Sequence, residues 1–368
     1  MADDTSRFMA MKGAGYYSQA TVGARDVITG AAPLVEAALA AQDLQTQTTP
    51  ITFTDMGCAD GGTSLEMWGR VLSDLRARLP EHALQLTYTD LPKNDFSQLF
   101  QIVHGQTSLP AYAPDIDNLY ITASATSFHH PIVPPGTLNL GFSATASHYI
   151  SQTPAQIADH VHMVGASGET RAAFQTQGAK DWEAFLLARA QELAPHGRLV
   201  LYNFGIDEDG RYLGHTGGKS MFDMFAQLWR DLVAEGTITE EEYRATNFPQ
   251  HYRTLEEFAA PFRDTNSPVY KAGLRLDDIG TVHTRCPFEK SFSEDHGDPL
   301  RFAKEYIPTL RSWSEPTFVA GLSGTRDAGE IAAIIDRFYQ SYEDAVAAAP
   351  EGHAMDYIHV RLVAYKHS

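Results

Sequence analysis

The first part of the chain alternates between short apolar runs and amphipathic segments. Residues 51–56 (ITFTDM) are an apolar run that predicts a buried strand. A helix is predicted to start at Thr63, because Thr63 and Glu66 have capping-box spacing, and to end at Pro80. Alternating apolar and polar positions over residues 84–90 predict a second strand. Such alternation of strands and helices is typical of an α/β layered fold.

The alternation continues, breaks off and then returns. Short strands are predicted at residues 119–122, 138–142 and 198–204. From about residue 206 to 320 the sequence is instead helical and loop-rich. Residues 358–364 then carry apolar side chains on one face, which predicts a last strand.

A strand that returns after an insertion indicates one domain with a lid, rather than two independent domains. The core is expected from residues 1–205 and 325–368, where the alternation lies. Residues 206–324 are expected to form an inserted, mainly α-helical cap.

Composition narrows the classes of partner. Hydrophobic residues make up 43% and charged residues 20%, which suits a globular protein with a large core. An excess of 46 Asp and Glu over 28 Lys and Arg gives a net charge of −18. Such a surface repels phosphate backbones and anionic lipid, so we expect neither a nucleic acid nor a membrane partner.

Targeting signals and cysteines point to the cytoplasm. The first ten residues, MADDTSRFMA, carry acids where a secretory signal has basic residues. The most apolar stretch, residues 31–41, contains Pro33 and Glu36, so we expect no membrane span. The two cysteines, Cys58 and Cys286, cannot form a disulfide framework and suit a reducing compartment.

A glycine-rich turn, residues 55–62 (DMGCADGG), joins the first strand to its helix. Glycines let a ligand approach the backbone, and the helix N-terminus offers unpaired N–H groups. Dinucleotides and S-adenosylmethionine both use this arrangement. Ala59 breaks the dinucleotide fingerprint, whereas Asp55, Gly57 and Gly61 fit the methyltransferase version. A purely structural turn stays open as the alternative.

Asp90 lies at the end of the second predicted strand. Its carboxylate is suited to accept hydrogen bonds from both hydroxyls of a ribose, or else to cap the following loop. The pairs His129–His130 and His160–His162 lack cysteine or carboxylate partners at ligand spacing. We therefore predict no metal site.

Six segments carry a more specific pattern. They are residues 11–28 (MKGAGYYSQATVGARDVI), 55–64 (DMGCADGGTS), 89–100 (TDLPKNDFSQLF), 142–154 (FSATASHYISQTP), 188–201 (ARAQELAPHGRLVL) and 247–258 (NFPQHYRTLEEF). In this order they resemble the SABATH family of S-adenosylmethionine-dependent methyltransferases, which includes the salicylate, benzoate and jasmonate carboxyl methyltransferases. The resemblance implies a Rossmann-like class I methyltransferase sheet, S-adenosyl-L-methionine as cofactor with S-adenosyl-L-homocysteine as product, and a homodimer.

The resemblance also implies a set of cofactor-binding residues. They are Tyr17 and Thr21, which close over the cofactor; Asp55, Gly57 and Cys58 near its methionine end; Asp90 and Leu91 at the adenosine; and Ser127 and Phe128 at the adenine. For Cys58 we expect a small packed residue rather than a nucleophile. For Phe128 we expect a ring stacked on adenine, with an ordinary core position as the alternative.

The substrate pocket departs from the family pattern. Family carboxyl methyltransferases hold the substrate carboxylate with a Gln and a Trp, and these positions here are Ala24 and Tyr149. Tyr149 can donate its hydroxyl, and His148 can donate an N–H group or supply a positive charge. Three further residues fall near pocket-lining positions, namely Met221, Phe222 and His251. Two histidines and a tyrosine favour a smaller or more polar acid than salicylate.

The sequence therefore predicts an enzyme that methylates the carboxylate of a small organic acid to give a methyl ester. A carboxylic acid with a pKa of about 4 is ionised near neutrality, so positioning is needed rather than a strong base. Two alternatives stay open. One is an N-methyltransferase acting on a heterocyclic nitrogen, with His148 or His251 as the base. The other is a non-catalytic relative that binds the cofactor or a metabolite.

Overall fold

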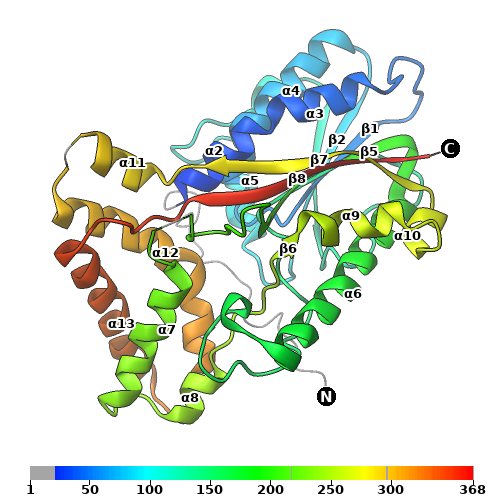
Figure 1. The fold of residues 1–368 in the computed structure, drawn as a ribbon. Helices are drawn as coiled ribbons and strands as arrows, with labels where there is room; N and C mark the ends of the chain where they lie inside the picture. Colours follow the sequence, from blue (N-terminus) through cyan, green and yellow to red (C-terminus); the bar gives the residue numbers. More distant parts are fainter. Residues whose placement is uncertain (1–20, 217, 296, 368) are drawn as a thin grey trace.

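A central sheet organises the molecule (Figure 1). The structure, a computed structural model, describes residues 21–216, 218–295 and 297–367. The strands are β1 (Ile51–Met56), β2 (Leu84–Asp90), β3 (Leu119–Ala125), β4 (Leu138–Ala144), β5 (Leu193–Ile206), β6 (Arg253–Thr254), β7 (Leu274–Thr284) and β8 (Tyr357–Lys366). Their order is β3-β2-β1-β4-β5-β8-β7, with β6 beside the end of β5.

Strands β1 to β5 run parallel to one another, and β8 lies antiparallel between β5 and β7. Every residue of β1 and of β4 is buried, as expected for central parallel strands covered on both faces. The carboxyl ends of the parallel strands and the start of β8 therefore meet at one edge of the sheet.

Helices cover both faces of the sheet (Figure 1). On one face α2 (Val22–Gly30), α3 (Ala32–Ala40) and α4 (Leu65–Arg78) pack together, and α5 (Phe96–Val103) follows β2. On the other face α6 (Gly168–Glu192), α9 (Leu255–Arg263) and α10 (Pro268–Lys271) pack together. No helix in these described ranges is both long and apolar enough to span a membrane.

A third group, the outer helices, lies beyond one end of the sheet (Figure 1). It consists of α7 (Met221–Ala234), α8 (Glu240–Ala245), α11 (Pro287–Glu294), α12 (Pro299–Gly321) and α13 (Ala328–Ala348). Buried rings fill its interior, among them Phe222, Phe225, Trp229, Phe248, Phe318, Phe338 and Tyr342. Such ring clusters give the outer helices a core of their own.

Strands predicted at 51–56 and 84–90 have the observed bounds, but the predicted capping box is wrong. A 3₁₀ turn over Gly62–Ser64 comes first, and α4 begins at Leu65 without a side-chain cap. Thr63 lies inside this 3₁₀ turn rather than at the N-cap, and the N-cap residue Ser64 donates its hydroxyl to Asp55 Oδ2 at 2.7 Å.

Two elements differ from the division expected from the sequence. The segment 206–324, expected to be mainly helical, contributes β7 to the sheet. Within 325–368, expected in the core, α13 packs on α12 and α7 of the outer helices. Strand β7 was missed because it is a half-exposed edge strand, so its apolar pattern is weak. Only β8 of the last segment lies in the sheet.

Candidate active site

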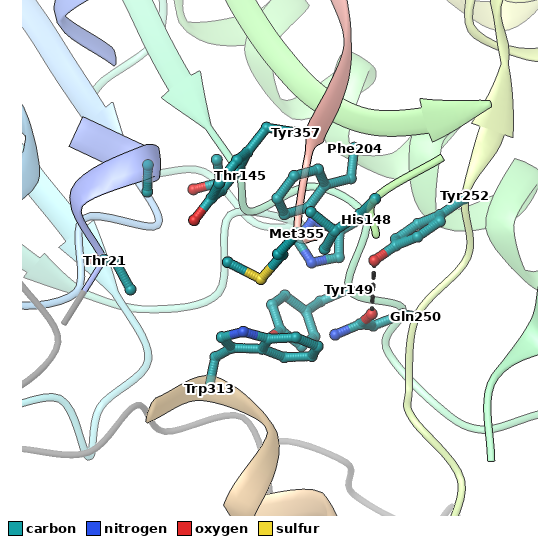
Figure 2. Close-up of a pocket in the computed structure, with 12 residues that line it drawn as sticks. Thr21, Thr145, His148, Tyr149, Phe204, Gln250, Tyr252, Trp313, Met355 and Tyr357 are labelled. Atoms are coloured by element: carbon teal, nitrogen blue, oxygen red, sulfur yellow. Dashed lines mark hydrogen bonds between the residues drawn. The ribbon is translucent and has the colours of Figure 1, made fainter. Parts of the chain in front are cut away.

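Two pockets lie at the carboxyl ends of the parallel strands. The turn pocket is lined by Ile28, Asp55, Gly57, Cys58, Thr63, Ser64, Phe142, Ala144 and Thr145. The aromatic pocket is lined by Thr21, Ala24, Thr145, His148, Tyr149, Phe204, Leu213, Gln250, Tyr252, Trp313, Met355 and Tyr357 (Figure 2). It holds about 410 Å³ of space free of atoms, its open mouth included. Thr145, which directly follows β4, lines both pockets.

The glycine-rich turn is folded back onto the end of β2. Gly57, Ala59 and Gly61 have positive φ values of 78°, 48° and 74°, a region that favours glycine. The N–H of Gly57 donates to the carbonyl of Thr89 at 2.8 Å. A Cβ atom at position 57 would lie 2.3 Å from the Cβ of Ala146. The close approach of these two segments therefore requires glycine at position 57.

Asp55 places a carboxylate at the floor of the turn pocket. Its side chain is buried, and Oδ2 accepts hydrogen bonds from Ser64 Oγ at 2.7 Å and Trp68 Nε1 at 2.9 Å. Burial raises the pKa of Asp55 to about 6, although both hydrogen bonds favour the charged form. A buried carboxylate of this kind suits a cationic group such as an ammonium.

Asp90 ties the turn to the second strand. Its Oδ2 accepts the N–H of Ala59 at 2.7 Å, and its Oδ1 accepts the N–H of Leu91 at 2.8 Å. It thus supports the turn, whereas the N-cap of α5 is Asp95. Burial and the nearby carboxylates raise the pKa of the Cys58 thiol well above its usual range. A neutral, buried thiol fits a packing role for Cys58.

The predicted adenine loop lies beside the turn. The ring of Phe128 packs edge-on against Phe185, and its Cε1 would lie 3.9 Å from a Cβ at Gly57. Ser127 Oγ accepts the N–H of His129 at 3.3 Å. Among the residues the structure describes, neither Ser127 nor Phe128 lines the turn pocket itself.

The aromatic pocket brings together four residues expected from the family resemblance, namely Thr21, Ala24, His148 and Tyr149. The His148 ring lies 4.4 Å from the Tyr149 ring and 4.8 Å from the Phe204 ring, measured between centroids. Burial lowers the pKa of His148 well below its usual range, so the imidazole is neutral at pH 7. Of the two roles expected for His148, a neutral N–H donor fits and a positive charge does not.

Three expected lining residues lie elsewhere. Phe222 is stacked on His162, at 3.8 Å between centroids, and Met221 packs against Gly214. Gln250 and Tyr252 face the pocket, whereas the His251 ring lies against Gly178 of α6. The segment is extended, so successive side chains point in opposite directions, which explains why His251 turns away. Tyr17 lies outside the described residues.

The pocket is consequently more apolar than the sequence suggested. Sequence reasoning missed most of its walls, including Trp313 of α12, Tyr357 at the start of β8 and Met355 just before that strand. Within the described parts of the chain, no Lys, Arg, Asp or Glu lines it. The topology could have indicated Tyr357, because ligands bind at the carboxyl ends of parallel strands and the antiparallel strand β8 begins at that end of the sheet.

The strand order, with one antiparallel strand inserted beside the last parallel ones, and the acid and glycine turn after β1 define a class I methyltransferase fold. Residues 5–366 match the family model described as SAM dependent carboxyl methyltransferase. The chain therefore belongs to this family, which is the SABATH family.

Relatives agree with this assignment, and a solved structure agrees with the fold. The chain is 28% identical over 259 residues to gibberellic acid methyltransferase 2 of Arabidopsis thaliana, covering 63% of this chain and 64% of that protein. It is 24% identical over 345 residues to probable caffeine synthase 4 of Coffea arabica, covering 82% and 85%. A structure of loganic acid methyltransferase with SAH matches the fold with a TM-score of 0.77 at 20% identity, covering 97% and 99%.

Proposed function

We propose that this chain transfers a methyl group from S-adenosyl-L-methionine to the carboxylate of a small organic acid, giving a methyl ester and S-adenosyl-L-homocysteine. The observation that carries the proposal is the arrangement around Thr145. On one side lies a pocket with the buried carboxylate of Asp55, and on the other an aromatic pocket without a charged side chain among its described residues.

The residues of the turn pocket suit this cofactor. Asp55 offers an anion for its ammonium group, and the positive φ values of the turn let a ligand approach the backbone. We propose the following cofactor set from the described residues: Thr21, Asp55, Gly57, Cys58, Asp90, Leu91, Ser127 and Phe128. When bound, the cofactor supplies a methyl group on a positively charged sulfur, which keeps the electron pair of the broken carbon–sulfur bond.

The chain's own residues then have two tasks, to orient the acceptor and to exclude water. A carboxylate needs no proton removed before it attacks, and desolvation makes it more reactive. Neutral His148 and the rings of Tyr149, Phe204 and Trp313 provide a dry, aromatic surface for this. An aromatic or aliphatic monocarboxylate fits such walls better than the smaller, more polar acid expected from the sequence.

Methylation of a heterocyclic nitrogen is the second candidate. The similarity to a probable caffeine synthase favours it, since caffeine carries its methyl groups on ring nitrogens. A protonated ring nitrogen requires a base. The lowered pKa of His148 makes it a weak one, and His251 does not line the pocket among the described residues. These observations favour the carboxylate.

We further propose that the outer helices and their loops form the substrate cap over the cofactor-binding core. Trp313 of α12 supports this, because it closes the aromatic pocket from the side opposite the sheet (Figure 2). A homodimer is proposed from the family resemblance alone, and light scattering of the purified protein tests it. A cytoplasmic location is proposed because both cysteines are free and buried.

Radiolabelled cofactor tests the main proposal. The protein is incubated with labelled S-adenosyl-L-methionine and, separately, benzoate, phenylacetate, cinnamate, hexanoate and the xanthine theophylline. Each product is then treated with mild alkali, which releases the label from a methyl ester but not from a methylated nitrogen. Alkali-labile label from at least one acid is expected. Alkali-stable label from theophylline alone would favour the nitrogen acceptor, and no transfer at all would favour a non-catalytic relative.

A further inference from the structure

The aromatic pocket has to hold an anion without a cation. Its described lining contains no lysine or arginine, and His148 is neutral at pH 7. Hydroxyl, amide and ring N–H groups are the donors that remain. Tyr252 already donates its hydroxyl to Gln250 Oε1 at 3.3 Å. The carboxylate of the acceptor has to face the turn pocket for methyl transfer, so its donors are sought at that side of the aromatic pocket.

Thr145 is placed where the two pockets meet. It follows the last residue of β4, and its N–H donates to the carbonyl of Tyr202 at 2.8 Å. Its φ of +56° lies in the left-handed region. Among the residues that the structure describes, Thr145 is the only β-branched residue with a positive φ. A β-branched residue rarely adopts this conformation, and strain of this kind persists mainly at functional sites. The left-handed backbone sets the direction of the threonine side chain between the two pockets.

Tyr357 brings a second hydroxyl to the same side. It is the first residue of β8, and its side chain is buried. Its ring lies against helix α2, because a Cβ at Gly23 would be 2.3 Å from Tyr357 Cε2 and 3.0 Å from its hydroxyl oxygen. Phe204 and His359 stack on this ring at 5.9 Å and 6.2 Å between centroids. The hydroxyl is therefore held at the start of α2.

Both side chains reach the end of the pocket that adjoins α2. Figure 2 shows the Thr145 and Tyr357 side chains extending toward this end, where Thr21 also lies. Ala24 of α2, the residue expected at the position of the family's Gln, lines the pocket there as well. The turn pocket, lined by Ile28 of the same helix, begins on the other side of Thr145.

We propose that the hydroxyl groups of Thr145 and Tyr357 bind the carboxylate of the acceptor and hold it facing the turn pocket. This inference rests on the proposed function and adds the residues that take over from the missing Gln and Trp. Neutral donors orient a carboxylate without pairing it with a fixed positive charge, so the oxygen keeps its nucleophilicity. The site therefore selects monocarboxylates with an apolar or aromatic body, and it discriminates against the corresponding amide.

Binding without turnover tests the inference. Calorimetric titration of protein saturated with S-adenosyl-L-homocysteine gives the dissociation constants of the four acids named above. The acid that binds most tightly is then compared with its primary amide. Thr145→Val and Tyr357→Phe each remove one hydrogen bond to a charged group, so each is expected to weaken binding of the acid about tenfold or more. Each is expected to weaken binding of the amide less than threefold. Thr145→Ser keeps the hydroxyl and is expected to keep the preference for the acid.

Matched controls separate local from general effects. Tyr342→Phe removes a buried tyrosine hydroxyl of α13, outside the aromatic pocket, and is expected to leave the preference for the acid unchanged. Tyr357→Phe is expected to keep the affinity for S-adenosyl-L-homocysteine within threefold. Thr145→Gly removes the strained side chain, so it is expected to raise Tm while losing the preference for the acid.

The inference is overturned if Thr145→Val and Tyr357→Phe both keep the wild-type preference for acid over amide, or if no acid of the panel binds the wild-type protein. The proposed function fails separately, when the wild-type protein forms no alkali-labile product. A wild-type protein that makes methyl esters, with variants that keep the preference, would refute only the role of these two hydroxyls.

Discussion

The guanidinium of Arg189, near the end of α6, donates a hydrogen bond to the carbonyl oxygen of Phe128 at 2.7 Å and a second one to that of His130 at 2.8 Å. Arg189 is fully buried and is paired with Glu192 at 2.5 Å. Glu192 in turn accepts the N–H of Val133 at 3.1 Å. One buried ion pair thus fixes the backbone of the loop that carries the predicted adenine-stacking ring.

This arrangement predicts that Arg189 acts on cofactor binding without touching the cofactor. Arg189→Lys keeps the charge opposite Glu192, but a lysine cannot reach both carbonyls with a planar fork. We expect the free energy of unfolding to fall by about 2 kcal/mol, the worth of one lost hydrogen bond from a charged donor. The dissociation constant of S-adenosyl-L-homocysteine, measured by calorimetry, is expected to rise roughly five- to tenfold because the loop must be ordered on binding.

Arg198→Lys is the control for this variant. Arg198, near the start of β5, pairs with the half-exposed Asp277 of β7. A lysine at position 198 is therefore expected to leave cofactor affinity unchanged. Equal affinity in Arg189→Lys and the wild-type protein would mean that the loop does not take part in cofactor binding.

Asp90 combines support of the turn with its predicted contact to the ribose. Asp90→Asn keeps one oxygen, so either the Ala59 or the Leu91 N–H loses its acceptor, and we expect a loss of stability of about 1–2 kcal/mol. Comparing S-adenosyl-L-homocysteine with its 2′-deoxy analogue isolates the ribose contact. The wild-type protein is expected to prefer the hydroxyl form about tenfold, and the variant to lose this preference. A preference that persists in Asp90→Asn would leave Asp90 with only its role in the turn.

The strands predicted from the sequence are those with a clear run or alternation of apolar residues. Residues 51–56 gave a strand with the observed bounds, because β1 is apolar and buried throughout. Strand β7 escaped prediction, since it is half-exposed and carries Asp277 and Asp278 near its middle. The capping box failed for another reason: a 3₁₀ turn over Gly62–Ser64 makes Ser64 the N-cap instead of Thr63. Ser64 forms a hydrogen bond with the distant Asp55, which no local spacing reveals.

The candidate site shows the same limit. The family resemblance pointed to Thr21, Ala24, His148 and Tyr149, and the structure brings all four to one pocket. Tyr357 was missed, because its place in the pocket depends on β8 entering the sheet antiparallel between β5 and β7. That insertion is set by the whole fold, and the apolar pattern of β8 alone does not indicate which end faces the site.

The raised pKa of Asp55 predicts that cofactor binding releases protons near pH 6. With its pKa raised to about 6, largely by burial, Asp55 is about half protonated at pH 6 in the free protein. If its carboxylate pairs with the ammonium of the cofactor, binding selects the ionised form and releases about half a proton at pH 6, and almost none at pH 8. Calorimetry of S-adenosyl-L-homocysteine binding in buffers of different ionisation enthalpy measures this release.

Asp55→Asn cannot ionise and is expected to bind the cofactor more weakly with no proton release at pH 6. The linkage also has a sign for stability. A carboxyl group whose pKa is raised on folding stabilises the fold at low pH and loses that contribution as the pH rises from about 4 to about 6. Proton release that is the same in the variant and the wild-type protein would assign it to another group.

The burial of His359 predicts a contribution to stability whose pH dependence is opposite to that of Asp55. Its ring is fully buried beside those of Phe204 and Tyr357, and neither ring nitrogen has a hydrogen-bond partner in the described structure. Burial lowers its pKa from 6.5 to about 3, so the folded state binds fewer protons than the unfolded state between these values. The contribution of His359 to stability is therefore fully present above pH 6.5 and is lost as the pH falls toward 3.

His359→Phe keeps a stacked ring and removes the titration together with the two unpartnered nitrogens. We expect the variant to be at least as stable as the wild-type protein at pH 7.5, because no buried polar atom is left unsatisfied. Between pH 7.5 and 5.5 it is expected to lose about 1 kcal/mol less than the wild-type protein, as one imidazole no longer has to stay neutral. Urea unfolding at the two pH values measures this difference. Equal losses in His359→Phe and the wild-type protein would show that His359 is not held neutral in the fold.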